Sequence, residues 1–257
     1  YFDKENKENV LSTKERADIE DYQLQINVNK PPTPDRIKFD IFERVNRAGT
    51  QLNKQEMRNA LYQGKATEVL KKLSELPIFR KITNNSIKKT RMKDRYVILR
   101  FIGFYLWREN LLVNDKGEKI EYKSDIDDFL AKVMEFVNTV NDQKLDNISN
   151  IFAKSLNHLN LVFDHNCFRL PSKTEKKRPI NMYLFEALCY FFINIDETII
   201  IKNKQKIKDE ISSLKNDENS EFYSSLTRST DSTVSVLSRF VTMHELAQKI
   251  IREAKND

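Results

Sequence analysis

Residues suited to holding a phosphate group gather around Arg44 and the helix start that follows it. Gly49 permits a turn with positive φ, and Asn53 lies three residues before Glu56, the spacing of a capped helix N-terminus. The first turn of a helix presents free backbone N–H groups and the positive end of the helix dipole. Arg44 and Asn46 would add donors toward an anion. The structural alternative is an ordinary turn, an ordinary helix cap and polar surface.

A second candidate site is the strongly basic segment 80–95. It contains seven cationic residues and a single acidic one, Asp94. Its net charge of +6 therefore equals that of the whole chain. Binding to nucleic-acid phosphates would be salt-dependent, and sparse aromatic residues make base stacking unexpected. The alternatives are a solvated loop with a helix end, and an ion pair between Arg91 and Asp94. The residues considered for nucleic-acid binding are Arg80, Lys81, Lys88, Lys89 and Arg91.

No pattern in the sequence indicates a complete catalytic or metal site. The three histidines, His158, His165 and His244, are scattered and lack partners at zinc-ligand spacing. The two cysteines, Cys167 and Cys189, lie in apolar surroundings and are predicted to be buried, reduced thiols, with a disulfide as the alternative. Reduced thiols indicate a reducing compartment such as the cytoplasm. We therefore expect no catalytic residue, no metal and no cofactor bound by this chain alone.

The composition favours a globular, helical protein. The chain has 257 residues, of which 39% are hydrophobic and 32% are charged, enough to bury a large core. Only four glycines are present, which argues against folds that need many tight turns. The most apolar runs fall short of the ~20 residues that a membrane helix needs, so a membrane partner is not expected.

Periodicity and capping signals predict the elements that would position these residues. Alternation in Tyr22–Val28 predicts a half-buried strand, but no convincing partner strand follows it. This orphan strand, and a first residue that is not methionine, suggest that the chain continues from an N-terminal piece. The charged stretch 202–221 is expected to be a solvated helix or a mobile loop, and 173–178 an exposed basic loop. Helices are expected over 13–20, 54–62, 67–75, 92–107, 125–140 (capped by Ser124), 147–163, 182–195 and 234–254.

The stretch Ile41–Gly64 resembles domain-of-unknown-function family 262, also called the GmrSD-type N-terminal domain. Further segments similar to family motifs are 91–101, 166–169, 184–187 and 229–239, so the resemblance covers most of the chain. The family's Asp-Gly-Gln-Gln-Arg loop, however, does not occur in this sequence. The residues that carry the resemblance in the first stretch are Phe42, Arg44, Asn46, Gly49, Leu52, Gln55, Glu56, Arg58 and Asn59.

The resemblance implies a mainly α fold, with a short α/β remnant of a ParB-like, sulfiredoxin-type domain over residues 1–62 and a helical domain over 63–257. The upstream part of that ParB-like domain would bind a nucleoside triphosphate and act in DNA-cleaving bacterial defence, as in restriction of phage. This chain would be the non-catalytic helical portion that supports the upstream domain in cis and contacts DNA, a protein partner or a second copy. The alternative is a stand-alone helical interaction module without enzymatic activity. The residues implied to lie beside the nucleotide site are Arg44, Asn46, Gly49, Gln55, Glu56, Arg58 and Asn59.

Overall fold

The computed structural model describes residues 10–26, 28, 37, 41, 44, 45, 51–163, 165–172 and 174–256. The chain divides into two units, Tyr1–Val45 and Asn46–Asp257. This division lies before the boundary expected after residue 62, so helix α3 (Lys54–Leu61) belongs to the larger unit. The reason is burial, because Gln55, Met57 and Arg58 of α3 are enclosed by that unit.

The smaller unit contains helix α1 (Thr13–Glu20), as its capping signals predict. The backbone N–H of Ser12 donates to Glu15 Oε2 (2.7 Å), and that of Glu15 donates to Ser12 Oγ (3.3 Å), which completes a capping box. The two bonds satisfy N–H groups that have no partner within the helix, so this start is determined by local sequence.

The predicted strand Tyr22–Val28 is wrong for the residues that can be described. Positions 22–26 and 28 have no regular secondary structure. Leu24 is 75% and Ile26 is 76% exposed, so the alternating apolar side chains are in solvent. A strand is stable only when another strand satisfies its backbone groups, and no pairing with this segment occurs within the described parts of the chain. The α/β character expected for 1–62 is therefore absent from its described residues.

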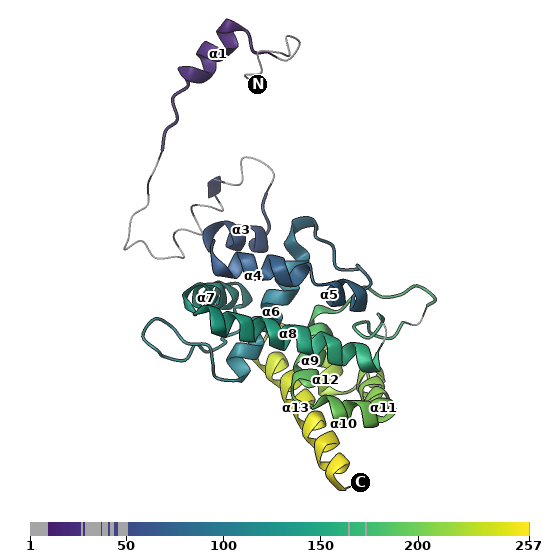
Figure 1. Ribbon diagram of the computed structural model, residues 1–257. Coiled ribbons are helices and arrows are strands. Elements are labelled where there is room, and N and C mark those ends of the chain that lie inside the picture. The colour runs from purple at the N-terminus through teal and green to yellow at the C-terminus, as the bar shows by residue number, and fades with distance from the viewer. Residues whose placement is uncertain are drawn as a thin grey trace. The chain divides into compact units, whose positions relative to one another are not determined.

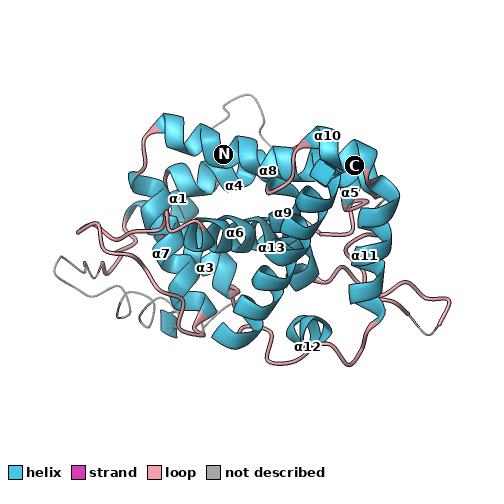
Figure 2. Cartoon of the chain, turned by 90° about the horizontal axis from the view of Figure 1, so that it is seen from below, coloured by secondary structure: helices cyan, strands magenta, loops and turns pink. Residues whose placement is uncertain are grey.

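The larger unit is a bundle of helices, in which long connections follow α6 and α8 (Figure 1, Figure 2). Among its described residues, β structure is limited to one isolated bridge between Val113 and Lys119, so the mainly α prediction is confirmed. Besides α3, its elements are α4 (Lys65–Ser74), α5 (Pro77–Ile82), the 3-10 turn η2 (Thr90–Met92), α6 (Lys93–Arg108), α7 (Ile126–Thr139), α8 (Asp142–Val162), α9 (Met182–Ile193), α10 (Glu197–Lys202), α11 (Lys204–Asn216), α12 (Glu221–Thr227) and α13 (Thr233–Asn256).

Helices α6 and α9 form the centre of this bundle. Helix α6 packs against α4, α7 and α9, and α9 also packs against α8 and α13 (Figure 2). All residues from Leu184 to Phe192 are buried, as are those from Val97 to Leu106. The run that became α6 is nearly apolar around its whole circumference, which is typical of an interior helix, and this prediction is confirmed; α9 is buried in the same way.

The structure corrects the expected cap of α7 and decides between the two alternatives for the stretch 202–221. Asp125, not Ser124, caps α7, because its carboxylate accepts from the backbone N–H groups of Asp127 (3.1 Å) and Asp128 (3.0 Å). Of the two alternatives for the charged stretch 202–221, the helix is confirmed, because the stretch contains α11, which buries Ile207. A sequence rich in lysine and glutamate hides such a sparse apolar stripe, so the helix and loop interpretations look alike before the fold is known.

A cluster of buried charges ties together α6, α9 and α13. Arg100 Nε donates to Glu186 Oε2 (2.9 Å), and Arg239 Nε donates to Glu186 Oε1 (2.9 Å). All three side chains are fully buried, and Arg100 Nη2 also lies 2.8 Å from Asp231 Oδ1. Burial alone would lower the pKa of Arg100, but the negative charge of Glu186 raises the pKa well above its usual value. Two cations therefore face two carboxylates, and the cluster fixes the relative positions of three helices.

Gly103 allows close contact between α6 and α7. A Cβ atom at this position would lie 2.9 Å from Val133 Cγ2 and 3.0 Å from Phe129 Cε1. Gly103→Ala is expected to destabilise the fold by about 1 to 2 kcal/mol, because overpacking outweighs the gain in helix propensity. Chemical denaturation measures this loss. The loss should shrink in a Val133→Ala background, where the nearest atom is removed; an equal loss in both backgrounds would contradict the steric explanation.

Candidate functional site

The start of α3 is built by Asn53, as its spacing predicts. Asn53 Oδ1 accepts from the backbone N–H groups of Gln55 (2.8 Å) and Glu56 (2.9 Å), and Glu56 Oε2 accepts from the N–H of Asn53 (2.7 Å). This capping box consumes donors of the first helical turn that an anion would otherwise use. The helix end therefore serves mainly to position the side chains of α3.

The basic loop before α6 is attached to this helix start. Asn53 Nδ2 donates to the carbonyl oxygen of Arg91 (2.8 Å), and Arg91 Nη2 donates to the carbonyl oxygen of Gln51 (2.7 Å) and lies 3.1 Å from Glu56 Oε2. Arg91 and Met92 both have left-handed φ values, 58° and 55°. Such a conformation costs about 1 to 3 kcal/mol per residue and persists when surrounding contacts hold it in place. The attachment to Asn53 and Glu56 provides those contacts.

Arg58 and Gln55 form a buried pair beneath this attachment. Arg58 is 1% exposed, and its Nη1 donates to Asp127 Oδ1 at 2.6 Å. Arg58 Nε and Nη2 both donate to Gln55 Oε1 at 3.2 Å, and the guanidinium carbon lies 5.7 Å from the centre of the Tyr96 ring. The Arg58–Asp127 pair connects α3 to α7 across 69 positions of sequence. Arg58 belongs to the block with family resemblance, but nothing in the sequence pairs it with Asp127, so only the fold reveals the pair.

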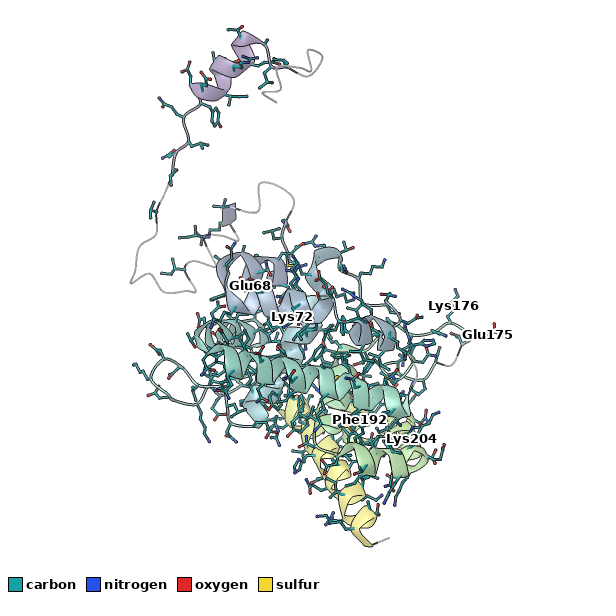
Figure 3. The ribbon with its side chains drawn as sticks, in the orientation of Figure 1. Glu68, Lys72, Glu175, Lys176, Phe192 and Lys204 are labelled. Carbon is teal, nitrogen blue, oxygen red and sulfur yellow. The ribbon has the colours of Figure 1, made fainter. Side chains whose placement is uncertain are left out.

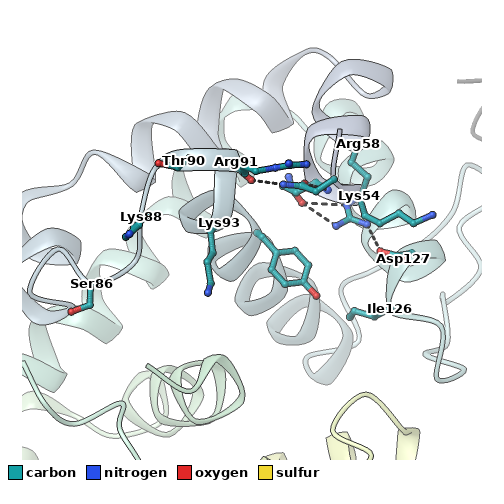
Figure 4. Close-up of a pocket in the computed structure, with 12 residues that line it drawn as sticks. Lys54, Arg58, Ser86, Lys88, Thr90, Arg91, Lys93, Ile126 and Asp127 are labelled. Atoms are coloured by element: carbon teal, nitrogen blue, oxygen red, sulfur yellow. Dashed lines mark hydrogen bonds and ion pairs between the residues drawn. The ribbon is translucent and has the colours of Figure 1, made fainter. Parts of the chain in front are cut away.

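These residues line a cavity of about 780 Å³ (Figure 4). Figure 4 shows Lys88 and Lys93 on one side of it, and Arg58 and Asp127 on the other. Five lining side chains are cationic and one is a carboxylate, so the cavity suits a ligand with more than one negative charge. The lining residues are Asn53, Lys54, Gln55, Arg58, Ser86, Lys88, Thr90, Arg91, Lys93, Tyr96, Ile126 and Asp127.

The cavity joins parts of the two predicted sites. Gln55 and Arg58 come from the block with family resemblance, and Lys88 and Arg91 from the basic segment. Sequence reasoning missed Lys93 and the residues supplied by α7, Ile126 and Asp127. Lys93 belongs to the basic segment, so its charge was visible in the sequence, whereas nothing local in the sequence signals the two α7 residues.

The other residues of the family-like block lie elsewhere. Glu56 lies 3.1 Å from Arg91 and attaches α3 to η2, whereas Asn59 Oδ1 accepts from Arg95 Nη1 (3.2 Å) and attaches α3 to α6. Arg44 is exposed in the smaller unit. Asn46 and Gly49 lie outside the described residues. The structure therefore brings Gln55, Glu56, Arg58 and Asn59 together on one helix.

Within the basic segment, arginines and lysines have different surroundings. The predicted ion pair between Arg91 and Asp94 is wrong, because Asp94 is buried and its Oδ2 accepts from Arg80 Nη2 at 2.7 Å. Arg80 also donates to the carbonyl oxygen of Ile87 (3.3 Å) and so braces the loop. By contrast, Lys81, Lys88, Lys89 and Lys93 are exposed, and none of them forms an ion pair with any residue that the structure describes.

The second basic loop lies against the first. Arg169 Nη2 donates to Ser86 Oγ (2.8 Å), and Arg169 Nη1 donates to the carbonyl oxygen of Arg178. The predicted exposure of this loop is confirmed at residues 174–179. Figure 3 shows Glu175 and Lys176 at the tip of the projecting loop. The Arg169–Ser86 contact therefore joins the base of this loop to the first basic segment, an adjacency between segments far apart in sequence.

The two cysteines and His158 are buried and contribute to the core. Cys167 and Cys189 are buried thiols that form no disulfide, and burial raises the pKa of Cys189 well above its usual value, which keeps it protonated. His158 is buried, with Nδ1 2.9 Å from the carbonyl oxygen of Phe192. In the part of the chain open to description, no group of three or more His, Cys, Asp or Glu residues could hold a metal ion.

Comparisons with known proteins identify no relative. No family model, no curated protein and no solved structure matches the chain. A search of the described helices likewise finds none both long enough and apolar enough to cross a lipid bilayer.

Proposed function

We propose that this chain is the non-catalytic helical portion of a ParB-like, nucleotide-dependent, DNA-targeting protein, and that its basic surface binds nucleic-acid phosphates. The resemblance of Ile41–Gly64 to domain-of-unknown-function family 262 supports the first part. In this proposal, nucleotide hydrolysis and DNA cleavage belong to the upstream domain, where the family carries its Asp-Gly-Gln-Gln-Arg loop. The role of this chain is to hold DNA for that domain.

The observation that carries nucleic-acid binding is the basic surface formed by loops 83–92 and 169–178 with their flanking residues. Its exposed lysines Lys81, Lys88, Lys89 and Lys93 lack carboxylate partners among the described residues. The contact from Arg169 to Ser86 joins the base of the second basic loop to this surface. Solvated lysines of this kind can neutralise backbone phosphates without first breaking an ion pair.

The composition of this surface favours backbone contacts over base recognition. Arg80 and Arg91, whose planar guanidinium groups suit bidentate base contacts, are bound to Asp94 and Glu56. Lysine ammonium groups contact phosphates as point charges. Binding in this proposal is therefore largely independent of DNA sequence and sensitive to salt.

Replacing Lys81, Lys88, Lys89 and Lys93 together by alanine is expected to weaken binding to a fluorescein-labelled DNA duplex by at least about tenfold at low salt. Each lysine that contacts a phosphate contributes about 0.9 to the slope of log affinity against log salt, so the slope should fall by about 3.6 if all four contact phosphates. Fluorescence anisotropy across a salt series measures both quantities.

A matched variant replaces four exposed lysines of the other helices, Lys154, Lys202, Lys204 and Lys208, by alanine. It removes the same net charge and should leave the salt slope nearly unchanged. Equal losses in the two variants would attribute binding to net charge rather than to this surface. No loss in either would reject DNA binding and favour the alternative of a helical protein-interaction module.

A further inference from the structure

The buried amide of Gln55 has an unsatisfied donor at the cationic cavity. Gln55 is 3% exposed, and its Nε2 makes no hydrogen bond with any described residue. The orientation of the amide is determined, because Oε1 accepts two N–H groups from Arg58 at 3.2 Å. A buried donor without an acceptor costs about 1 to 3 kcal/mol. An acceptor supplied by a ligand would remove that cost.

The charges around Gln55 specify what kind of acceptor fits. Arg58 is already paired with Asp127 at 2.6 Å, so the lining's only carboxylate is engaged. Lys88 and Lys93 line the same cavity, and neither has a carboxylate partner among the described residues. An oxygen of a ligand with more than one negative charge could accept from Gln55 Nε2, and the charge of that ligand would balance the excess of cations.

We propose that this cavity is a binding site for a phosphate group, with one phosphate oxygen accepting from Gln55 Nε2 and with Lys88 and Lys93 neutralising its charge. A volume of about 780 Å³ lies within the range of small-molecule sites, about 300–1,000 Å³, so an organic phosphate of nucleotide size fits. The phosphate belongs either to a free small molecule or to a nucleic-acid backbone. This inference rests on the proposed function only in that both use Lys88 and Lys93. The Gln55 contact is independent of it, because Gln55 is buried and is not part of the outer basic surface.

The test is isothermal titration calorimetry of the whole chain with inorganic pyrophosphate. Gln55→Glu keeps the oxygen that accepts from Arg58 and replaces the unsatisfied donor by a second carboxylate oxygen. This variant should fold at least as stably as the wild type, because Arg58 gains a charged partner. Its affinity for pyrophosphate should fall by at least about tenfold, since a donor is lost and a negative charge is added.

A matched control is Asn59→Asp, which makes the same chemical change on the same helix outside the cavity. Asn59 accepts from Arg95 at 3.2 Å and does not line the cavity. Its pyrophosphate affinity should change by less than about threefold, because the added carboxylate is paired with Arg95 and no donor of the cavity lining is lost. Equal losses in the two variants would overturn the Gln55 contact, as would a wild-type chain that does not bind pyrophosphate.

Competition distinguishes the two sources of the phosphate and separates this inference from the proposed function. If pyrophosphate displaces the labelled duplex and Gln55→Glu weakens duplex binding, the cavity holds a backbone phosphate. If pyrophosphate binds through Gln55 without displacing the duplex, the cavity holds a free organic phosphate. Pyrophosphate binding without any duplex binding would support the cavity site and reject the proposed function. Duplex binding without pyrophosphate binding would support the proposed function and reject the cavity site.

Discussion

Replacement of Glu186 by glutamine is expected to lower the free energy of unfolding by about 3 to 5 kcal/mol, because two buried arginines lose their shared counter-charge. Glu186 Oε1 accepts from Arg239 Nη2 at 2.5 Å and from Nε at 2.9 Å, and Oε2 accepts from Arg100 Nε at 2.9 Å. Glutamine can accept hydrogen bonds through one oxygen only and carries no charge. The expected fall in melting temperature is roughly 10 °C for a chain of this size. Urea denaturation followed by circular dichroism measures the free energy directly.

Two further variants check that charge balance is the cause. Glu175→Gln makes the same change on an exposed loop and should alter stability by less than about 0.5 kcal/mol. Arg239→Gln in the Glu186→Gln background removes one buried positive charge together with the negative one. The double variant should therefore lose less than the sum of the two single variants. Additive losses would show that packing, and not charge balance, determines the effect.

Replacement of Phe152 by alanine is expected to lower the free energy of unfolding by about 3 to 5 kcal/mol, because it leaves a cavity where four helices meet. The Phe152 ring on α8 is fully buried, and its centre lies 5.4 Å from that of Phe101 on α6, 6.0 Å from Phe79 on α5 and 6.4 Å from Phe185 on α9. The surrounding residues cannot easily move into this cavity, because the backbone of each of the four helices is fixed by its own hydrogen bonds. Chemical denaturation of Phe152→Ala measures the loss.

The control for Phe152 is an exposed apolar residue in a helix. Val234 on α13 is 78% exposed, so Val234→Ala removes methyl groups without opening an internal cavity. Its stability should change by less than about 0.5 kcal/mol. Phe152→Leu should lie between the two alanine variants, because it fills most of the space. A loss for Phe152→Ala as small as that for Val234→Ala would contradict the packing of α8 described above.

The core variants also separate stability from binding. Glu186 and Phe152 are fully buried and line none of the cavity, whereas Lys88 and Lys93 are exposed beside it. Loss of DNA or pyrophosphate binding in a lysine or Gln55 variant with unchanged stability would therefore report on the site. Loss of binding in Glu186→Gln would report only on folding.

The sequence by itself determined the helical class and most helix positions. Ser12 and Asn53 lie three residues before Glu15 and Glu56, and both spacings produce the capping boxes that they predict. The apolar run that became α6 is buried, as its nearly uniform apolar character predicts. Such signals are local, because a cap or a periodic apolar stripe involves residues within one or two turns of each other. The excess of charge in segment 80–95 was visible for the same reason.

Only the tertiary structure decided which of these charges and apolar residues have partners. Arg80 and Lys81 look alike in the sequence, yet the first is held by Asp94 and the second is exposed. Tyr22–Val28 has the pattern of a strand, but its described residues find no partner and stay in solvent. A strand, an ion pair and a cavity each depend on residues brought together from distant positions. Their free energy depends on the burial and neighbours that the fold creates, and so no local pattern encodes them.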